Sequence, residues 1–140
     1  MSWIIYALLS ALFAALVAIF GKIGIQNVNS NVAVAIRTLI IVFFAWGIVF
    51  LEGKSGDIFK ISKHSYLFIA LSALATGLSW LFYYKALQLG PVSRVSTVDK
   101  LSVALSILLA FFILSEKPSA GNIIGGTLVT AGVMAAILIK

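Results

Sequence analysis

The sequence contains no cysteine, a single histidine and only four acidic residues among 140. Without cysteine it can form no disulfide, no thiolate metal site and no thiol nucleophile. The histidine, His64, stands beside Lys63 with no second histidine and no cluster of carboxylates, so we expect no metal site. The motifs of serine hydrolases, phosphate-binding loops and zinc proteases do not occur either. We therefore expect neither enzyme activity nor a cofactor.

Charged residues are scarce and apolar residues are abundant. Asp, Glu, Lys and Arg make up 10% of the chain and hydrophobic residues 62%, and the mean hydropathy is +1.16. An average globular protein is about half apolar and about a quarter charged. A water-soluble fold of this size would expose more apolar surface than its interior could hide. The composition predicts an integral membrane protein and excludes a soluble enzyme, a disordered chain and, despite a net charge of +6, a protein that binds nucleic acid.

Five apolar runs have about the length that a helix needs to cross a bilayer. They cover residues 3–20, 32–51, 66–84, 95–115 and 121–139. A helix of about 20 residues spans the ~30 Å of hydrocarbon. Pro91 and Pro118 fall beside spans, where a missing amide donor does little harm. The predicted fold is all-α, a bundle of five transmembrane helices that forms one domain over residues 1–140 and lies in the lipid bilayer of the cell membrane.

The basic residues outside the spans favour neither orientation in the membrane. Five spans place the two termini on opposite sides. Four lysines lie on the N-terminal side, namely Lys54, Lys60, Lys63 and Lys117. Four basic residues lie on the other side, namely Lys22, Lys85, Arg94 and Lys140. The positive-inside rule gives no bias here. Either another feature fixes one topology, or the chain inserts both ways and pairs with an inverted copy of itself, which would recreate the inverted repeat of many transporters.

Three charged residues fall inside predicted spans, namely Arg37, Asp99 and Lys100. They lie ~7–9 Å from the midplane, and such a side chain costs ~2.5–3.5 kcal/mol at a helix centre. Arg37 and Lys100 can snorkel to the headgroups, whereas the shorter Asp99 needs a cation or a water-filled cavity. The span directions bring Arg37 and Asp99 to one membrane face, together with Lys22 and Lys85. We expect either a structural ion pair or a vestibule whose positive charge meets an anionic or zwitterionic solute.

Polar and aromatic side chains recur at helical spacing in two spans. One face of the 66–84 span carries Ser72, Thr76, Ser79 and Tyr83, and the stripe beside it carries Gly77, Trp80 and Tyr84. The next span carries Asp99, Ser102 and Ser106. We predict a substrate pathway lined by Arg37, Ser79, Trp80, Tyr83, Tyr84, Asp99, Lys100 and Ser102. The alternatives are helix packing through small and hydroxyl side chains, and a belt of Trp and Tyr at the membrane interface.

Several segments carry a resemblance to a known family. They are residues 10–16, 20–24, 35–38, 71–90 (LSALATGLSWLFYYKALQLG) and 95–102 (VSTVDKLS). These segments resemble the EamA-type transporters of the drug/metabolite transporter superfamily, and more narrowly its short, single-repeat bacterial and archaeal members. The resemblance covers essentially the whole chain. Because larger relatives fuse two five-helix repeats of opposite orientation, it implies that a single-repeat chain works as a homodimer, for which an antiparallel arrangement is one form.

The same resemblance implies a secondary transporter that runs on a gradient. Our first expectation is an exporter of small polar metabolites such as amino acids, which works by alternating access in a dimer. The alternatives are a flippase for a lipid-linked solute and a non-transporting membrane scaffold or accessory subunit. The four-helix multidrug exporters of the superfamily use a glutamate in their first helix. Ala14 and Ala15 stand in that region here, so export of cationic drugs by that mechanism is not expected.

Overall fold

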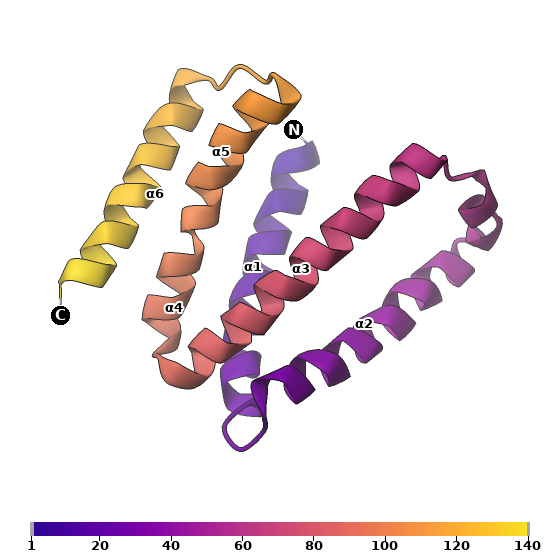
Figure 1. The fold of residues 1–140 in the computed structure, drawn as a ribbon, viewed down its shortest axis with the longest axis horizontal. Helices are drawn as coiled ribbons and strands as arrows, with labels where there is room; N and C mark the ends of the chain where they lie inside the picture. The colour runs from indigo at the N-terminus through magenta and orange to yellow at the C-terminus, as the bar shows by residue number, and fades with distance from the viewer. Residues whose placement is uncertain (1, 140) are drawn as a thin grey trace. The chain divides into compact units, whose positions relative to one another are not determined.

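The computed structural model describes residues 2–139, and Figure 1 shows that helices account for most of them. In chain order these are α1 (Ser2–Gly24), α2 (Ser30–Leu51), the 3-10 helix η1 (Ser55–Lys60), α3 (Lys63–Leu89), α4 (Val92–Asp99), α5 (Leu101–Leu114) and α6 (Ala120–Leu138). The described residues contain no strand, and the predicted all-α fold is confirmed. Lys140, which was counted in the charge comparison, lies outside the described residues.

Five helical segments of the described chain are long and apolar enough to cross a membrane. They are α1, α2, α3, the segment Val92–Leu114 and α6, and each overlaps one of the predicted runs. At most 11% of an 18-residue window in any of them is buried inside the protein. Outward-facing apolar side chains suit helices in a bilayer, because lipid tails are as apolar as leucine. The prediction of five membrane-spanning helices is confirmed.

Local capping explains where two of the helices begin. The side chain of Asn29 accepts a hydrogen bond from the amide of Asn31 at 2.9 Å, directly before α2. Ser119 accepts one from the amide of Asn122 at 3.2 Å, directly before α6. These side chains satisfy amides that have no partner within the first turn of a helix.

The third span is longer than its apolar run. The run covers residues 66–84, whereas α3 extends from Lys63 to Leu89. The hydroxyl of Ser62 accepts a hydrogen bond from the amide of Ser65 at 3.0 Å and so starts the helix one turn earlier. With 27 residues, α3 is ~40 Å long, which exceeds the thickness of the hydrocarbon. The helix α3 is therefore long enough to extend beyond the hydrocarbon.

The fourth span begins earlier than predicted and is interrupted. In place of one helix over residues 95–115, α4 ends at Asp99 and α5 begins at Leu101. The amides of Lys100 and Val103 bond to carbonyls three residues back, at 3.1 and 3.0 Å, which tightens the turn relative to an α-helix. One turn earlier the hydroxyl of Thr97 donates to its own helix at 2.7 Å, a contact that often bends helices. The span is thus broken at its two charged residues.

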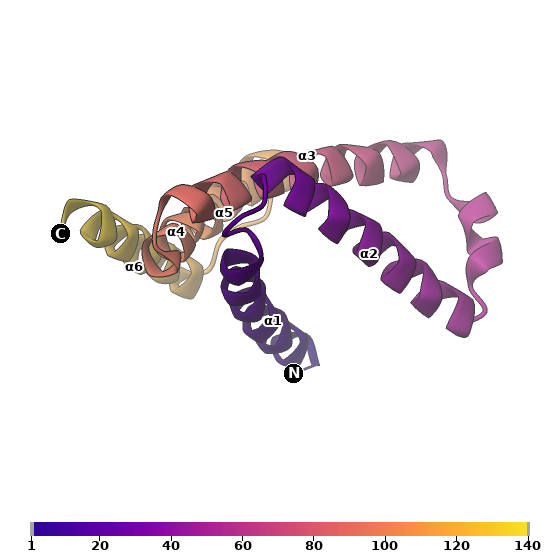
Figure 2. The same cartoon turned by 90° about the horizontal axis from the view of Figure 1, so that it is seen from below.

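The chain divides into two compact units, which we call the α2–α3 unit (residues 19–88) and the α4–α6 unit (residues 2–18 and 89–139). In the α2–α3 unit, the two helices approach each other where α2 begins and α3 ends, and they splay apart toward η1 (Figures 1 and 2). In the α4–α6 unit, α6 packs along α4 and α5 (Figure 1). The single transmembrane domain expected over residues 1–140 stays a prediction.

Candidate functional site

Arg37 lies against two aromatic rings within the α2–α3 unit. Its guanidinium carbon is 4.0 Å from the centroid of the Trp80 ring and 5.5 Å from that of the Tyr84 ring. Trp80 and Tyr84 are one turn apart on α3 and therefore share a face. A cation over an aromatic ring gains ~0.5–2 kcal/mol, and more where water is excluded. The rings therefore help to stabilise a charge in the middle part of a membrane-spanning helix.

One nitrogen of this guanidinium has no partner. Among the described residues, Nη1 of Arg37 is buried and donates a hydrogen bond to no acceptor. Leaving a buried donor without an acceptor costs ~1–3 kcal/mol, and more for a charged group. The guanidinium carbon lies over both rings, and the N–H groups of a guanidinium form hydrogen bonds within its plane. The site thus holds an unused donor beside two aromatic side chains.

Tyr84 is fixed in place by the end of α1. Its side chain is only 5% exposed. A Cβ atom added at Gly21 would lie 3.2 Å from the Tyr84 hydroxyl and 3.3 Å from Cζ of the ring, so only a glycine fits at this position without displacing the ring. On its other side Tyr84 meets the ring of Tyr83 edge-on, with centroids 6.3 Å apart. The second ring at Arg37 is therefore positioned by packing.

The C-terminal end of α3 is tied to the connection between α1 and α2. The amine of Lys22 donates a hydrogen bond to the carbonyl of Leu87, whose side chain is fully buried. The side-chain amide of Gln88 donates to the carbonyl of Val28 at 2.7 Å. Carbonyls in the last turn of a helix have no partner within it, and a cation there also interacts favourably with the helix dipole. These contacts hold the start of α2, and with it Arg37, against α3.

Positive charge dominates this end of the α2–α3 unit. The two carboxylates of residues 19–88 belong to Glu52 and Asp57, and both follow the C-terminal end of α2. Glu52 is 15 residues beyond Arg37, which corresponds to ~22 Å along a helix. Asp57 pairs with Lys60 at 2.7 Å within η1. Within this unit, Arg37 therefore has no acidic residue close to it along α2.

The remaining residues of the predicted pathway are divided between the α2–α3 unit and the α4–α6 unit. Ser79 is exposed on α3, and Tyr83 lies beside Tyr84. Asp99, Lys100 and Ser102 belong to the α4–α6 unit, at the break between α4 and α5. The structure brings Arg37 together with Trp80 and Tyr84, and Tyr83 contacts Tyr84. Arg37 and Asp99 lie in different units, and a pairing between them stays a prediction.

Asp99 pairs with its neighbour in sequence. Its carboxylate is 3.6 Å from the amine of Lys100, and the side chains are 39% and 55% exposed, respectively. The hydroxyl of Ser106 donates to the carbonyl of Ser102 at 2.7 Å, so this hydroxyl is used within its own helix. A neighbouring lysine was one of the partners expected for Asp99. Whether the pair serves transport or structure stays a prediction.

Two elements of the Arg37 site could not be read from the sequence pattern. The contact of Gly21 with Tyr84 and the bond from Lys22 to Leu87 join residues more than 60 positions apart. Periodicity along one helix identifies a face but not its partner on another helix. A usable signal was present, because Gly21 and Lys22 stand together at the end of an apolar run, a position suited to close packing and to a snorkelling lysine.

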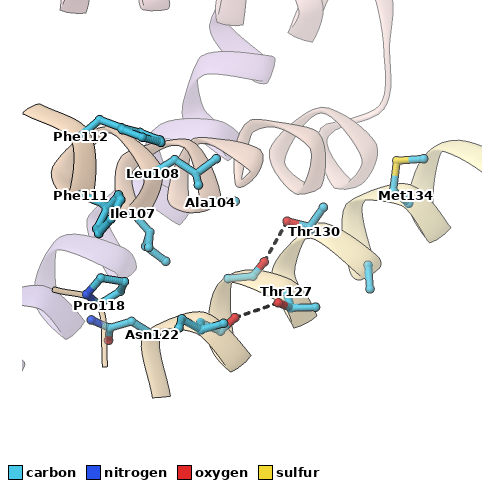
Figure 3. A pocket seen from close by; sticks show the side chains of 13 residues that line it. Ala104, Ile107, Leu108, Phe111, Phe112, Pro118, Asn122, Thr127, Thr130 and Met134 are labelled. Carbon is cyan, nitrogen blue, oxygen red and sulfur yellow. Dashed lines mark hydrogen bonds between the residues drawn. The ribbon is translucent and has the colours of Figure 1, made fainter. Parts of the chain in front are cut away.

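A groove of about 700 Å³ lies between α5 and α6 in the α4–α6 unit (Figure 3). Its lining is mostly apolar and includes Ile107, Phe111 and Met134. Thr127 and Thr130 also line it, but their hydroxyls donate to carbonyls of their own helix, both at 2.8 Å (Figure 3). The groove therefore offers few polar groups to a solute and suits an apolar chain or side chain.

Comparison with known proteins agrees with this architecture. Residues 1–138 match the EamA-like transporter family. A curated protein from Sinorhizobium sp, named an uncharacterized transporter in cobO 3'region, is 42% identical over 133 residues, which cover 95% of this chain and 94% of the relative. No solved structure matches the chain. With five membrane-spanning segments and these two matches, the chain is a multi-pass membrane protein that belongs to the EamA-like transporter family.

Proposed function

We propose that this protein is a secondary transporter that exports small polar metabolites, such as amino acids, across the cell membrane. Membership of the transporter family supports transport as the activity. The observation that carries the choice of a polar, anionic or zwitterionic solute is the guanidinium of Arg37, which has an unused buried donor beside Trp80 and Tyr84. An intramembrane charge is costly, so its presence indicates a functional site.

We propose roles for the predicted pathway residues of each unit. Arg37 selects solutes by charge, and the rings of Trp80 and Tyr84 line or gate the passage beside it. Asp99 and Lys100 provide a second charged element at a break in a membrane-spanning segment. Broken helices line binding sites in many transporters, because irregular backbone is tolerated where it faces a cavity. The other pathway residues are Ser79, Tyr83 and Ser102.

We propose further that the working unit is a homodimer with alternating access, in which two copies take the place of two fused repeats. Two observations support this proposal. The basic residues flanking the spans are divided four to four, which permits an antiparallel pair. Asp99 and Lys100 are 39% and 55% exposed in a segment of spanning length, and a second copy would cover them.

Flux into proteoliposomes tests the transport proposal. Purified protein is reconstituted, and uptake of labelled amino acids is measured for the wild type, Arg37→Gln and Arg94→Gln. Because a hydrogen bond to a charged group contributes ~1.5–3 kcal/mol, Arg37→Gln should lower flux about 10- to 150-fold. Arg94 is exposed on α4, so its variant serves as a matched control and should transport normally. Unaltered flux in Arg37→Gln would remove Arg37 from the pathway, and absence of flux for every solute would favour a scaffold.

Single-cysteine labelling tests the antiparallel dimer. The chain has no native cysteine, so Asn27→Cys and Gly56→Cys each introduce one thiol, before and after α2 respectively, without changing the charge balance. Both positions are exposed. If the chain inserts both ways, an impermeant reagent should label about half of each variant from outside intact cells. Complete labelling of one variant and none of the other would exclude the antiparallel pair.

A flippase for a lipid-linked solute is the second candidate function. The observation that favours it is the apolar groove of about 700 Å³ between α5 and α6, which has room for part of a lipid chain. Substituting Ala104, which lines the groove, with Phe would obstruct part of it. A flippase should then lose activity, whereas export of amino acids through the Arg37 site should continue.

A further inference from the structure

We infer that Arg37 binds the carboxylate group of the transported solute, with the edge of its guanidinium as the binding surface and the rings of Trp80 and Tyr84 as the walls. The inference rests on the proposed function and names the chemical class of its substrate. A guanidinium carries five N–H donors in one plane and no acceptor. The guanidinium carbon lies 4.0 Å from the centroid of the Trp80 ring, and an acceptor binds where the N–H groups point, at the edge of the guanidinium plane.

The chemistry of the edge favours an anion with two oxygen atoms in a plane. Arginine and carboxylate groups commonly form two parallel N–H···O bonds, and such charge-assisted bonds are stronger than neutral ones. Nη1 is buried and has no partner among the described residues. A bound carboxylate would satisfy this donor and remove the cost of leaving it unpaired. Beside two aromatic rings, in surroundings less polar than water, such a bond is electrostatically stronger.

The balance of charge favours a carboxylate over a phosphate. Lys22 and Lys85 are the other cations at this end of the unit; the amine of Lys22 is bonded to the carbonyl of Leu87, and Lys85 is exposed on α3. Arg37 therefore supplies one positive charge to a ligand. A carboxylate carries one negative charge, whereas a phosphate monoester carries about 1.5 to 2 at neutral pH. Burying the additional charge without a second cation would be costly.

Tryptophan fluorescence provides a direct test. The chain has three tryptophans, and Trp3→Phe with Trp46→Phe leaves Trp80, which stacks on Arg37, as the one reporter. In detergent, this variant is titrated with each of the twenty amino acids, with the primary amines that lack their carboxylates, and with inorganic phosphate. We expect a saturable change in Trp80 emission with at least one amino acid and none with the corresponding amine.

Substitutions at Arg37 then test the geometry. Arg37→Lys keeps the charge but loses the planar pair of donors, and we expect it to raise Kd at least tenfold. Arg37→Gln should abolish binding, and Arg94→Gln should leave Kd unchanged. Circular dichroism checks that each variant keeps its helices. Equal affinity for the amines, tighter binding of phosphate than of any carboxylate, or unchanged binding in Arg37→Gln would each overturn the inference.

The outcomes separate this inference from the proposed function. Saturable binding of a carboxylate that depends on Arg37, without flux in proteoliposomes, would support the inference and contradict the transporter. Arg37-dependent flux of amines in preference to amino acids would support the transporter and overturn the inference. If both hold, the amino acid that binds in the fluorescence titration should be the one that is transported.

Discussion

The protein places charged side chains inside two membrane-spanning segments and supports them differently. Arg37 stands in the unbroken helix α2 and is covered by two rings from α3. Asp99 and Lys100 stand at the break between α4 and α5, pair with each other at 3.6 Å and are partly exposed. The first arrangement depends on contacts between helices. The second is local, because its partners are adjacent in sequence.

This difference bears on which site is preformed. The Arg37 site is held by packing at Gly21, by the bond from Lys22 to Leu87 and by the rings, so it exists within the α2–α3 unit alone. The Asp99–Lys100 pair has no comparable support within its described surroundings. Preorganised groups bind with a smaller cost of ordering. Selection of the solute is therefore expected at Arg37, and rearrangement during transport at the break.

Removing the tie between α1 and α3 should have the largest effect on the Arg37 site. In Lys22→Gln the charged donor to the carbonyl of Leu87 is lost, so we expect the free energy of unfolding to fall by ~1.5–2 kcal/mol. Thermal unfolding in detergent measures this change in the free energy of unfolding. Lys85→Gln is the control, since Lys85 is exposed on α3. If the free energy of unfolding fell equally in the two variants, the hydrogen bond from Lys22 to Leu87 would make no specific contribution to stability.

Crowding Tyr84 should have the next largest effect. Gly21→Ala places a methyl group 3.2 Å from the Tyr84 hydroxyl, and this buried ring has little room to move. We expect ligand affinity at Arg37 to fall severalfold, as measured by Trp80 fluorescence. Gly24→Ala is a matched control, because no atom lies within 4 Å of its added Cβ. Alanine is favoured over glycine in a helix by ~1 kcal/mol, so Gly24→Ala should not destabilise the protein.

Neutralising the local pair should affect transport more than stability. Partly exposed ion pairs contribute ~0–1 kcal/mol, so Asp99→Asn should change the free energy of unfolding by less than ~1 kcal/mol. If the break takes part in transport, flux should fall severalfold in the same variant. The opposite result, a less stable protein with normal flux, would identify the pair as structural.

The smallest effect is expected in the connection between α2 and α3. Asp57 and Lys60 pair at 2.7 Å, but their side chains are well exposed. Asp57→Asn should therefore change stability by ~0.5 kcal/mol or less and leave flux unaltered. A large effect on flux would show that this connection belongs to the pathway. Transport would then depend on a charged group other than Arg37 and the Asp99–Lys100 pair.

The sequence was sufficient to predict the membrane-spanning helices and the family. Apolar length and composition carry this information, because the bilayer sets the same requirement for every span. The sequence also indicated Arg37, Trp80 and Tyr84 as members of one site, since helical spacing places the two aromatic residues on one face. The match to the family over residues 1–138 confirmed the resemblance carried by the motifs.

The sequence was not sufficient to predict the break at Lys100 or the contacts that hold Tyr84. The apolar run continues on the C-terminal side of Lys100 and resembles an uninterrupted helix, whereas the break follows from the backbone bonds of Lys100 and Val103. The contact with Gly21 depends on how α1 meets α3. Such contacts arise from tertiary packing, for which a pattern along one helix carries no direct signal.

The break at Lys100 also bears on how the protein is made. With 8 and 14 residues, α4 and α5 are ~12 and ~21 Å long, so neither alone crosses ~30 Å of hydrocarbon. The insertion machinery therefore has to accept Val92–Leu114 as a single segment, with Asp99 and Lys100 inside it. The predominantly apolar side chains of α5 offset the cost of the two charges as they leave the translocon. We therefore expect α4 to enter the bilayer together with α5 during biosynthesis.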